Sequence, residues 1–170
     1  MVSYTKKGRV ADSIGVEWKT YFVNKKDTEA LAIGDILVLD ETNKYYEKGG
    51  AAAAGLDFAV VAKAAAAANT TNPTVEVWKD KGTRVALEAG GTLPAHCFVQ
   101  LDASNNVVVW TLAAGVNPNE VVGQYNQHTA SKATGTTTAD FVDATTALPD
   151  AAAGELVYID LNVRPPSGGA

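Results

Sequence analysis

The sequence predicts an all-β fold, built as a single small β-barrel or β-sandwich, and three observations support this. Residues 74–78 and 83–88 each alternate apolar and polar side chains, with a turn-like stretch at 79–82 between them. Alternation with a period of two is typical of a strand buried on one face, so these residues predict a hairpin. A second hairpin and the weakness of any helical pattern are the other two observations.

The second predicted hairpin lies at residues 98–110. Two apolar runs, 98–101 and 107–110, flank the polar stretch 102–106, which consists largely of turn-forming residues. Three further segments rich in β-branched, aromatic or aliphatic residues are expected to be strands: 16–23, 36–39 and 154–163. Short strands at close spacing, separated by Gly, Asn and Asp, are typical of a barrel or a sandwich.

The only helical alternative concerns residues 51–68, where Ala is frequent. Residues 59–68 have high helix propensity. Phe58, Val60 and Val61 instead suit a strand that leads into a loop. Both interpretations stay open at this point, and with either one less than a quarter of the chain is expected to be helical.

Three segments of the chain resemble one another. Residues 34–40, 96–102 and 154–160 each end in an aliphatic residue followed by Asp, namely Asp40, Asp102 and Asp160. An Asp at the end of a strand can accept hydrogen bonds from the backbone of the next turn, which predicts a structural role for all three. We interpret the similarity as one strand motif used repeatedly within a single barrel.

Composition and charge exclude several classes of partner. The chain has 170 residues, 46% of them hydrophobic, and a net charge of −5 without a long basic run. A nucleic-acid groove or an anionic membrane requires a basic face, so neither partner is expected. The N-terminus lacks the apolar stretch of a signal peptide, and no segment has the roughly 20 apolar residues needed to span a bilayer. Synthesis in a cytoplasm is therefore expected.

Residues suited to catalysis are few. Cys97 is the only cysteine, and its neighbour His96 should point to the opposite face of the same strand. A nucleophile–base pair between Cys97 and His128 would need a long-range contact that nothing in the sequence supports. No metal-ligand spacing or phosphate-binding loop occurs. We predict no enzymatic activity, no metal and no cofactor.

The chain divides into a body and two ends. Residues 1–24 are interpreted as an N-terminal arm with the first strand, and residues 25–163 as the β domain. Within the domain, the Thr- and Ala-rich stretch 126–147 is expected to be a surface insertion. Residues 164–170 contain two prolines and are expected to form a flexible tail. Residues 1–15 are expected to pack poorly against their own domain.

Aromatic residues near the ends of the predicted strands are candidates for contact with a partner, because large amphipathic side chains anchor interfaces. The alternative for each is packing within its own domain. The candidate contact residues are Tyr4, Arg9, Trp18, Tyr21, Tyr45 and Tyr46. Trp78, Phe98 and Trp110 lie within clear strands and are expected in the core.

The order of these segments resembles a known family. The resemblance rests on residues 34–40, 58–62, 75–87, 92–102, 120–123 and 156–163, and residues 92–102 read Thr-Leu-Pro-Ala-x-x-Phe-Val-x-Leu-Asp. Over residues 25–163 the chain resembles the small capsid cement, or head decoration, proteins of tailed phages. The resemblance implies a barrel or β-tulip-like domain, often trimeric, on the exterior of the virion. The Ala-rich stretches and residues 126–147 depart from the family pattern.

The expected function follows from that resemblance. The chain should bind the major capsid protein as a homotrimer and stabilise the capsid lattice, without a catalytic residue. The alternative is a tail or fibre component or a glycan-binding β module. A glycan-binding groove would place Trp78 or Trp110 in an exposed position beside polar side chains.

Overall fold

The computed structural model describes residues 7–11, 17–53, 59–69, 73–113, 117–132 and 148–166, with only the backbone considered for 127–132. The described residues contain no α-helix, which confirms the predicted all-β class. The elements are β1 Thr20–Asn24, β2 Ile36–Asp40, β3 Tyr45–Lys48, β4 Val60–Ala62, β5 Thr74–Trp78, β6 Arg84–Glu88, β7 Phe98–Leu101, β8 Val107–Val109, the 3₁₀ turn η1 Pro118–Glu120, β9 Gly123–Lys132 and β10 Glu155–Leu161. The predicted hairpin at 98–110 is present as β7–β8. The predicted hairpin at 74–88 is wrong, because β5 and β6 both form but the chain crosses from one sheet to the other between them, so β5 pairs with β1 and β4 and β6 pairs with β10.

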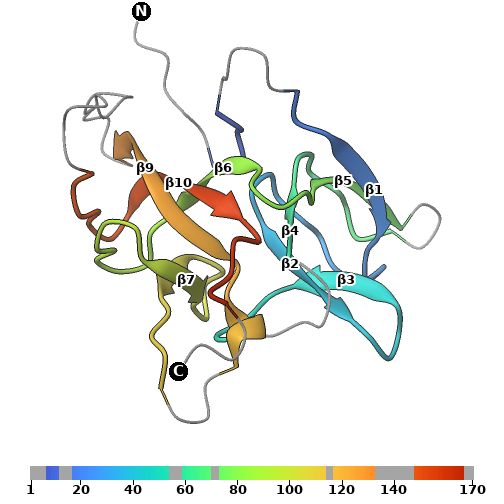
Figure 1. Ribbon diagram of the computed structural model, residues 1–170. Helices are drawn as coiled ribbons and strands as arrows, with labels where there is room; N and C mark the ends of the chain where they lie inside the picture. The colour runs from blue at the N-terminus through green and yellow to red at the C-terminus, as the bar shows by residue number, and fades with distance from the viewer. Residues whose placement is uncertain are drawn as a thin grey trace, which may run out of the picture.

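Two antiparallel sheets of five strands make up the molecule, and Figure 1 shows them side by side. The first contains β1 to β5 and the second β6 to β10. Single bridges between Lys25 and Tyr46 and between Ala89 and Val107 bring the two edge strands of each sheet together at one end. Neither sheet closes into a barrel among the described residues, so of the two predicted architectures a β-sandwich fits.

The second sheet repeats the topology of the first. The strand orders are β1-β5-β4-β2-β3 and β6-β10-β9-β7-β8, so adding five to each strand number converts one into the other. The connections match as well, because Leu31 exchanges two backbone hydrogen bonds with Ala66, and Leu93 exchanges two with Ala151. The chain is therefore an internal duplication of one five-stranded unit, which we call the first half (β1–β5) and the second half (β6–β10).

Strand register confirms the correspondence residue by residue. Ile36 lies opposite Val61 in the first half, and Phe98 lies opposite Gln124 in the second. Residues 31–40 and 93–102 therefore align, and they share only Leu31/Leu93, Leu39/Leu101 and Asp40/Asp102. Two of the three similar segments noted in the sequence thus occupy equivalent positions. The third contains β10, which corresponds to β5 and not to β2.

The three Asp residues of that motif have different roles. Asp40 accepts hydrogen bonds from the N–H groups of Thr42 and Asn43, as predicted for the turn after a strand. Asp102 likewise accepts from the N–H groups of Ser104 and Asn106. Asp160 instead forms an ion pair with Arg84 at 2.8 Å, because β10 continues past it.

A shared hydrophobic core joins the halves. The larger cluster contains Ile36, Val61 and Trp78 from the first half together with buried residues of β6, β7, β9 and β10 from the second. A smaller cluster that includes Leu37 and Val77 lies within the first half. Trp78 and Trp110 are both buried, as the sequence predicted.

Asn162 forms a buried polar connection between the halves. Its side-chain Nδ2 donates to the carbonyl oxygens of Ala59 and Lys79 at 2.8 and 3.0 Å. Its backbone N–H donates to Val122 of the second half. Asn105 makes a second connection of this kind, at the β7–β8 turn.

Residues 7–11 depart from the expected loose arm. The N–H groups of Gly8 and Ala11 donate to the carbonyl oxygens of Ala86 and Arg84, and Ala86 N–H donates to Arg9. These residues add a short antiparallel segment to β6, centred on the bridge from Val10 to Val85. The contact was not predicted because its partner strand is more than 70 residues away in the sequence.

Two further expectations change in part. Strand β9 continues to Lys132, so residues 126–132 of the expected surface insertion belong to a strand that pairs with β10. Residues 133–147 lie outside the described part of the chain.

In the expected tail, Arg164 donates to the Val121 carbonyl at 3.0 Å, which fixes the tail at its first residue. Among the described residues of 51–68, β4 is followed by a loop, so the strand-then-loop interpretation holds.

Candidate partner-binding surfaces

Strand β1 presents the most exposed aromatic residue of the described chain. Phe22 is 73% exposed and its neighbour Tyr21 is 38% exposed. The Tyr21 hydroxyl donates to Asp80 Oδ1 at 2.8 Å, and this hydrogen bond to a carboxylate raises the pKa of Tyr21. Phe22 lies beside the candidate Tyr21, and because Tyr21, Phe22 and Val23 are all apolar, alternation alone could not show which of them faces outward.

The other candidate contact residues lie in different environments. Trp18 is partly buried against the larger cluster, and its indole N–H donates to Ala11 at 2.8 Å. Arg9 is exposed on the segment paired with β6. Tyr45 is half-buried, with Lys26 Nζ 6.0 Å from its ring centre. Tyr46 is 6% exposed and belongs to the core, so it is not available to a partner. Tyr4 lies outside the described residues.

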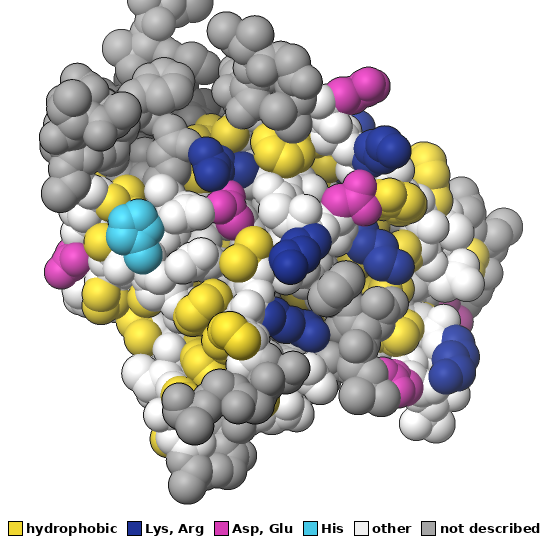
Figure 2. Space-filling model, in the orientation of Figure 1, with side chains coloured by type: hydrophobic (Ala, Val, Ile, Leu, Met, Phe, Trp, Pro, Cys, Tyr) yellow, Lys and Arg dark blue, Asp and Glu magenta, His cyan; other side chains and the backbone are white. Residues whose placement is uncertain are grey.

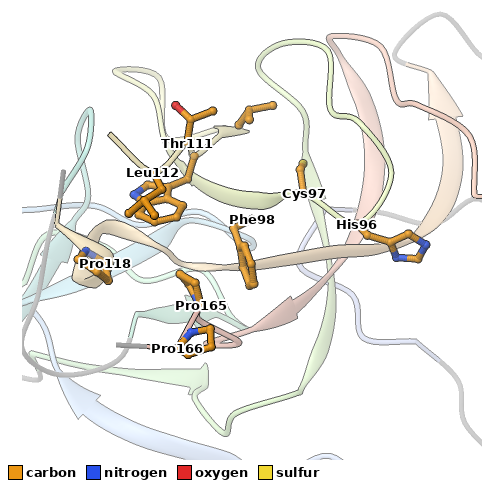
Figure 3. Close-up of a pocket in the computed structure, with 10 residues that line it drawn as sticks. His96, Cys97, Phe98, Thr111, Leu112, Pro118, Pro165 and Pro166 are labelled. Carbon is orange, nitrogen blue, oxygen red and sulfur yellow. The ribbon is translucent and has the colours of Figure 1, made fainter. Parts of the chain in front are cut away.

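A pocket of about 530 Å³ opens in the second half, beside β7 and β8 (Figure 3). Residues from β7, from the stretch after β8 and from the chain end line it: His96, Cys97, Phe98, Val109, Trp110, Thr111, Leu112, Pro118, Pro165 and Pro166. The lining is mainly apolar and aromatic. Such a lining favours an apolar or aromatic group over a charged one.

Phe98 and Trp110 form the aromatic part of this pocket. Their rings meet edge to face, with centres 6.4 Å apart and planes at 89°. The indole N–H of Trp110 is buried and has no hydrogen-bond partner among the described residues. Leu112 is 67% exposed and adds an apolar group to the same region. The pocket is thus a second place where apolar surface meets solvent.

Cys97 lines the pocket but is a poor nucleophile. Burial raises the pKa of its thiol to about 11, so the thiol is protonated at neutral pH. Figure 3 shows the His96 ring directed away from Cys97, but the reason differs from the predicted one, because His96 lies in a turn before β7 with a φ of 62° and not in a strand. His96 Nδ1 instead lies 3.1 Å from Asn126 Oδ1. The two side chains do not form a nucleophile–base pair.

A polar chain runs from His96 across the outer face of the second sheet. Asn126 Nδ2 donates to Asp160 Oδ2, and Arg84 donates to both oxygens of the same carboxylate, from Nε to Oδ1 at 2.8 Å and from Nη2 to Oδ2 at 3.3 Å. The cost of burying part of this hydrogen-bonded network is offset, because each oxygen of the Asp160 carboxylate accepts a hydrogen bond. We interpret it as a structural network that fixes β6, β9 and β10.

Charges elsewhere are mixed in sign. Figure 2 shows Lys and Arg side chains interspersed with Asp and Glu across one face. Several are paired, for example Lys63 with Glu76 at 3.0 Å and Lys48 with Asp35 at 3.1 Å. In the described part of the chain no three His, Cys, Asp or Glu side chains gather closely enough to hold a metal ion. His128 lies opposite Val157 in the ladder, and its side chain is outside the description.

Comparison with known proteins gives no match to this chain, whether the comparison is with family models, curated proteins or solved structures. Within the described residues, no helix has the length and apolar character to cross a membrane. The functional assignment therefore depends on the sequence pattern and on the two apolar surfaces, the β1 edge and the pocket.

Proposed function

We propose that this chain is a structural virion protein that binds the outside of a viral capsid, through the major capsid protein, and stabilises the lattice. The observation that carries the proposal is the segment pattern over residues 25–163, which resembles that of phage capsid cement proteins. The trimeric state typical of such proteins is part of the proposal.

The described surfaces suit a binding role. Interfaces depend on a few large apolar or aromatic side chains that become buried on contact. Phe22 and Leu112 are exposed residues of this kind, and they lie on different halves of the molecule. A lattice of identical subunits would engage such a residue, for example Leu112, on every copy, so weak contacts add up through avidity.

The β body suits the same role. The two halves share one core, and Asn105 and Asn162 connect them through buried hydrogen bonds. A preformed body loses little conformational entropy on binding, which favours attachment without refolding.

The glycan-binding alternative requires an exposed Trp beside polar groups. Trp78 and Trp110 are 7% and 6% exposed, so neither offers its ring face to a sugar. The observation that would favour this alternative is therefore missing from the described residues.

Co-sedimentation tests the proposal directly. Heads assembled from the major capsid protein encoded in the same genome, without this chain, are mixed with the purified protein and pelleted. The protein should pellet with the heads in a fixed stoichiometry and raise the temperature at which they disrupt. The variant Leu112→Ser changes a side chain that is 67% exposed and outside the core, and it should bind at least tenfold more weakly. Protein that stays in the supernatant at saturating concentration would refute capsid binding.

A further inference from the structure

We propose that the open edge of β1 binds an extended N-terminal segment, residues 2–6, of a second copy of this chain. The inference concerns assembly between copies and does not depend on capsid binding. It follows from comparing the four sheet edges and from the internal duplication.

The edge of β1 lacks the protection found on the other three edges. Sheet edges are usually blocked by charges, by short length or by a covering segment, because their free N–H and C=O groups pair readily with another chain. Strand β3 carries Glu47 and Lys48, β8 has three residues, and β6 is covered by residues 8–11. Strand β1 has five residues without a charge or a proline.

The covered edge of β6 shows what an added segment looks like in this fold. Ala86 N–H donates to Arg9, and Ala86 C=O accepts from Gly8 N–H at 2.7 Å. Arg84 C=O accepts from Ala11 N–H at 2.9 Å. The small residue Ala11 also packs over Ala86 and Tyr158 on the outer face of the sheet.

The strand register shows which residues of β1 correspond to the residues of β6 that pair with the added segment. Arg84 lies opposite Asp160, and Thr20 lies opposite Trp78. Asp160 pairs with Gln124 of β9, and Trp78 pairs with Val61 of β4. Gln124 and Val61 occupy equivalent positions, so Asp160 and Trp78 are equivalent as well. Thr20 therefore corresponds to Arg84, and Phe22 to Ala86.

The backbone of Phe22 is consequently the open counterpart of Ala86. Tyr21 and Val23 correspond to the residues that face the neighbouring strand, so the N–H and C=O of Phe22 point toward the edge. In the described part of the molecule nothing pairs with these groups. The Phe22 side chain is 73% exposed beside them. An added strand would satisfy the backbone and cover apolar surface in one step.

Residues 2–6 have the properties of that strand. They read Val-Ser-Tyr-Thr-Lys, so β-branched and aromatic residues are frequent and no charge occurs before Lys6. They directly precede the segment fixed on β6, and five extended residues reach roughly 16 Å from it. Donation of this segment to β1 of the next copy is a heterologous contact, and three such contacts related by a three-fold rotation form a closed trimer.

Two variants test the two sides of the contact separately. One chain lacks Met1–Lys6 and begins at Lys7, so it keeps the segment on β6. The other carries Phe22→Pro, which removes the outward N–H and is tolerated at a sheet edge; Phe22→Lys replaces it if the proline variant does not fold. Light scattering after size exclusion should give an oligomer for the intact chain and a monomer for each variant. Leu112→Lys, a matched change at an exposed apolar residue elsewhere, should leave the mass unchanged.

Mixing the two variants provides the decisive result. The truncated chain keeps an intact β1, and the Phe22 variant keeps an intact N-terminus, so an equimolar mixture should form a two-chain species. If the truncated chain stays oligomeric while the Phe22 variant is monomeric, β1 pairs with another segment, such as a second β1, and the proposal is wrong. Three other results would overturn the proposal equally. The intact chain could be monomeric at 100 µM, which is about a hundredfold above a ~1 µM dissociation constant. The variants could keep the mass of the oligomer, or their mixture could stay monomeric.

Discussion

The side-chain amide of Asn105 pairs with the backbone of Ile36 in both directions. Ile36 N–H donates to Asn105 Oδ1 at 2.8 Å, and Asn105 Nδ2 donates to Ile36 C=O at 2.8 Å. Nδ2 also donates to the Gly49 carbonyl at 2.9 Å. Asn105 lies on the β7–β8 turn and Ile36 begins β2, so these bonds connect the two halves. The Asn105 side chain is 2% exposed, so solvent does not reach the backbone groups that it pairs with.

Replacing Asn105 by Gly should lower the free energy of unfolding by about 2–4 kcal/mol. The change keeps the positive φ of 64° at no steric cost, so the loss comes from unpaired buried backbone groups. Urea unfolding followed by tryptophan fluorescence measures it. The control is Lys44→Gly at the equivalent, exposed turn position, with a φ of 60°. That variant should change stability by less than about 1 kcal/mol, and equal losses for both would contradict the role of the amide.

Gly123 is required because β9 and β10 approach closely there. A Cβ at this position would lie 2.5 Å from the Asp160 carbonyl oxygen and 2.5 Å from Ile159 Cγ2. Both atoms belong to buried residues of β10, so relief requires the strands to separate. Gly123→Ala should therefore cost about 2–3 kcal/mol. Gly50→Ala has no heavy atom within 4 Å of the new Cβ and should be near neutral in the same thermal melts. Similar melting temperatures for the two variants would argue against this close approach.

The strands β5 to β8 and the β7–β8 hairpin could be predicted because their information is local, whereas the pairing expected between β5 and β6 does not form. Alternation and turn residues within about 15 residues define β5, β6, β7 and β8. The duplication could not be predicted from the sequence, because equivalent positions hold unrelated residues such as Trp78 and Asp160. Only strand pairing relates them, and these pairs join strands that are far apart in the sequence, so a short-range side-chain pattern does not reveal them.

The candidate contact residues show the same limit. Tyr45 and Tyr46 are adjacent, and alternation means that one must face inward, yet four residues of β3 are too few to tell which. The pairing of residues 8–11 with β6 could not be predicted because Gly-Arg-Val-Ala has no strand pattern of its own. Its conformation depends on tertiary contact, which overrides local propensity.

Truncation should distinguish residues 1–6 from residues 7–11. A chain beginning at Asp12 loses the hydrogen bonds to Arg84 and Ala86 and the buried side chain of Ala11. Its free energy of unfolding should fall by about 2–4 kcal/mol. A chain beginning at Lys7 keeps these contacts, so at concentrations where both are monomeric it should be the more stable of the two. Equal stability in urea would show that the segment does not contribute to the fold in solution.

Cys97 should react slowly with alkylating reagents. With a thiol pKa of about 11, about one molecule in a thousand carries the thiolate at pH 8. An unfolded cysteine, with a pKa near 9.0, carries it in about one of ten. Iodoacetamide at pH 8 should therefore modify the folded protein about 100-fold more slowly than the protein in 8 M urea, as followed by mass spectrometry. Because Cys97 is the only cysteine, no second site complicates the rate. Equal rates would show that the thiol is not buried.

Stability should decrease as the pH rises above 9. Burial raises the pKa of Cys97 to about 11 and also raises that of Tyr125, whose hydroxyl donates to the Pro149 carbonyl at 2.8 Å. Between pH 9 and 11 the unfolded chain loses these protons while the folded chain keeps them, so rising pH favours unfolding. The contribution is complete below pH 9 and declines by up to about 1.4 kcal/mol per pH unit for each group. Urea unfolding at pH 8, 9, 10 and 10.5 measures the slope, and Cys97→Ala should make it shallower from pH 9 onward. A slope identical to that of the unchanged protein would mean that Cys97 titrates alike in both states.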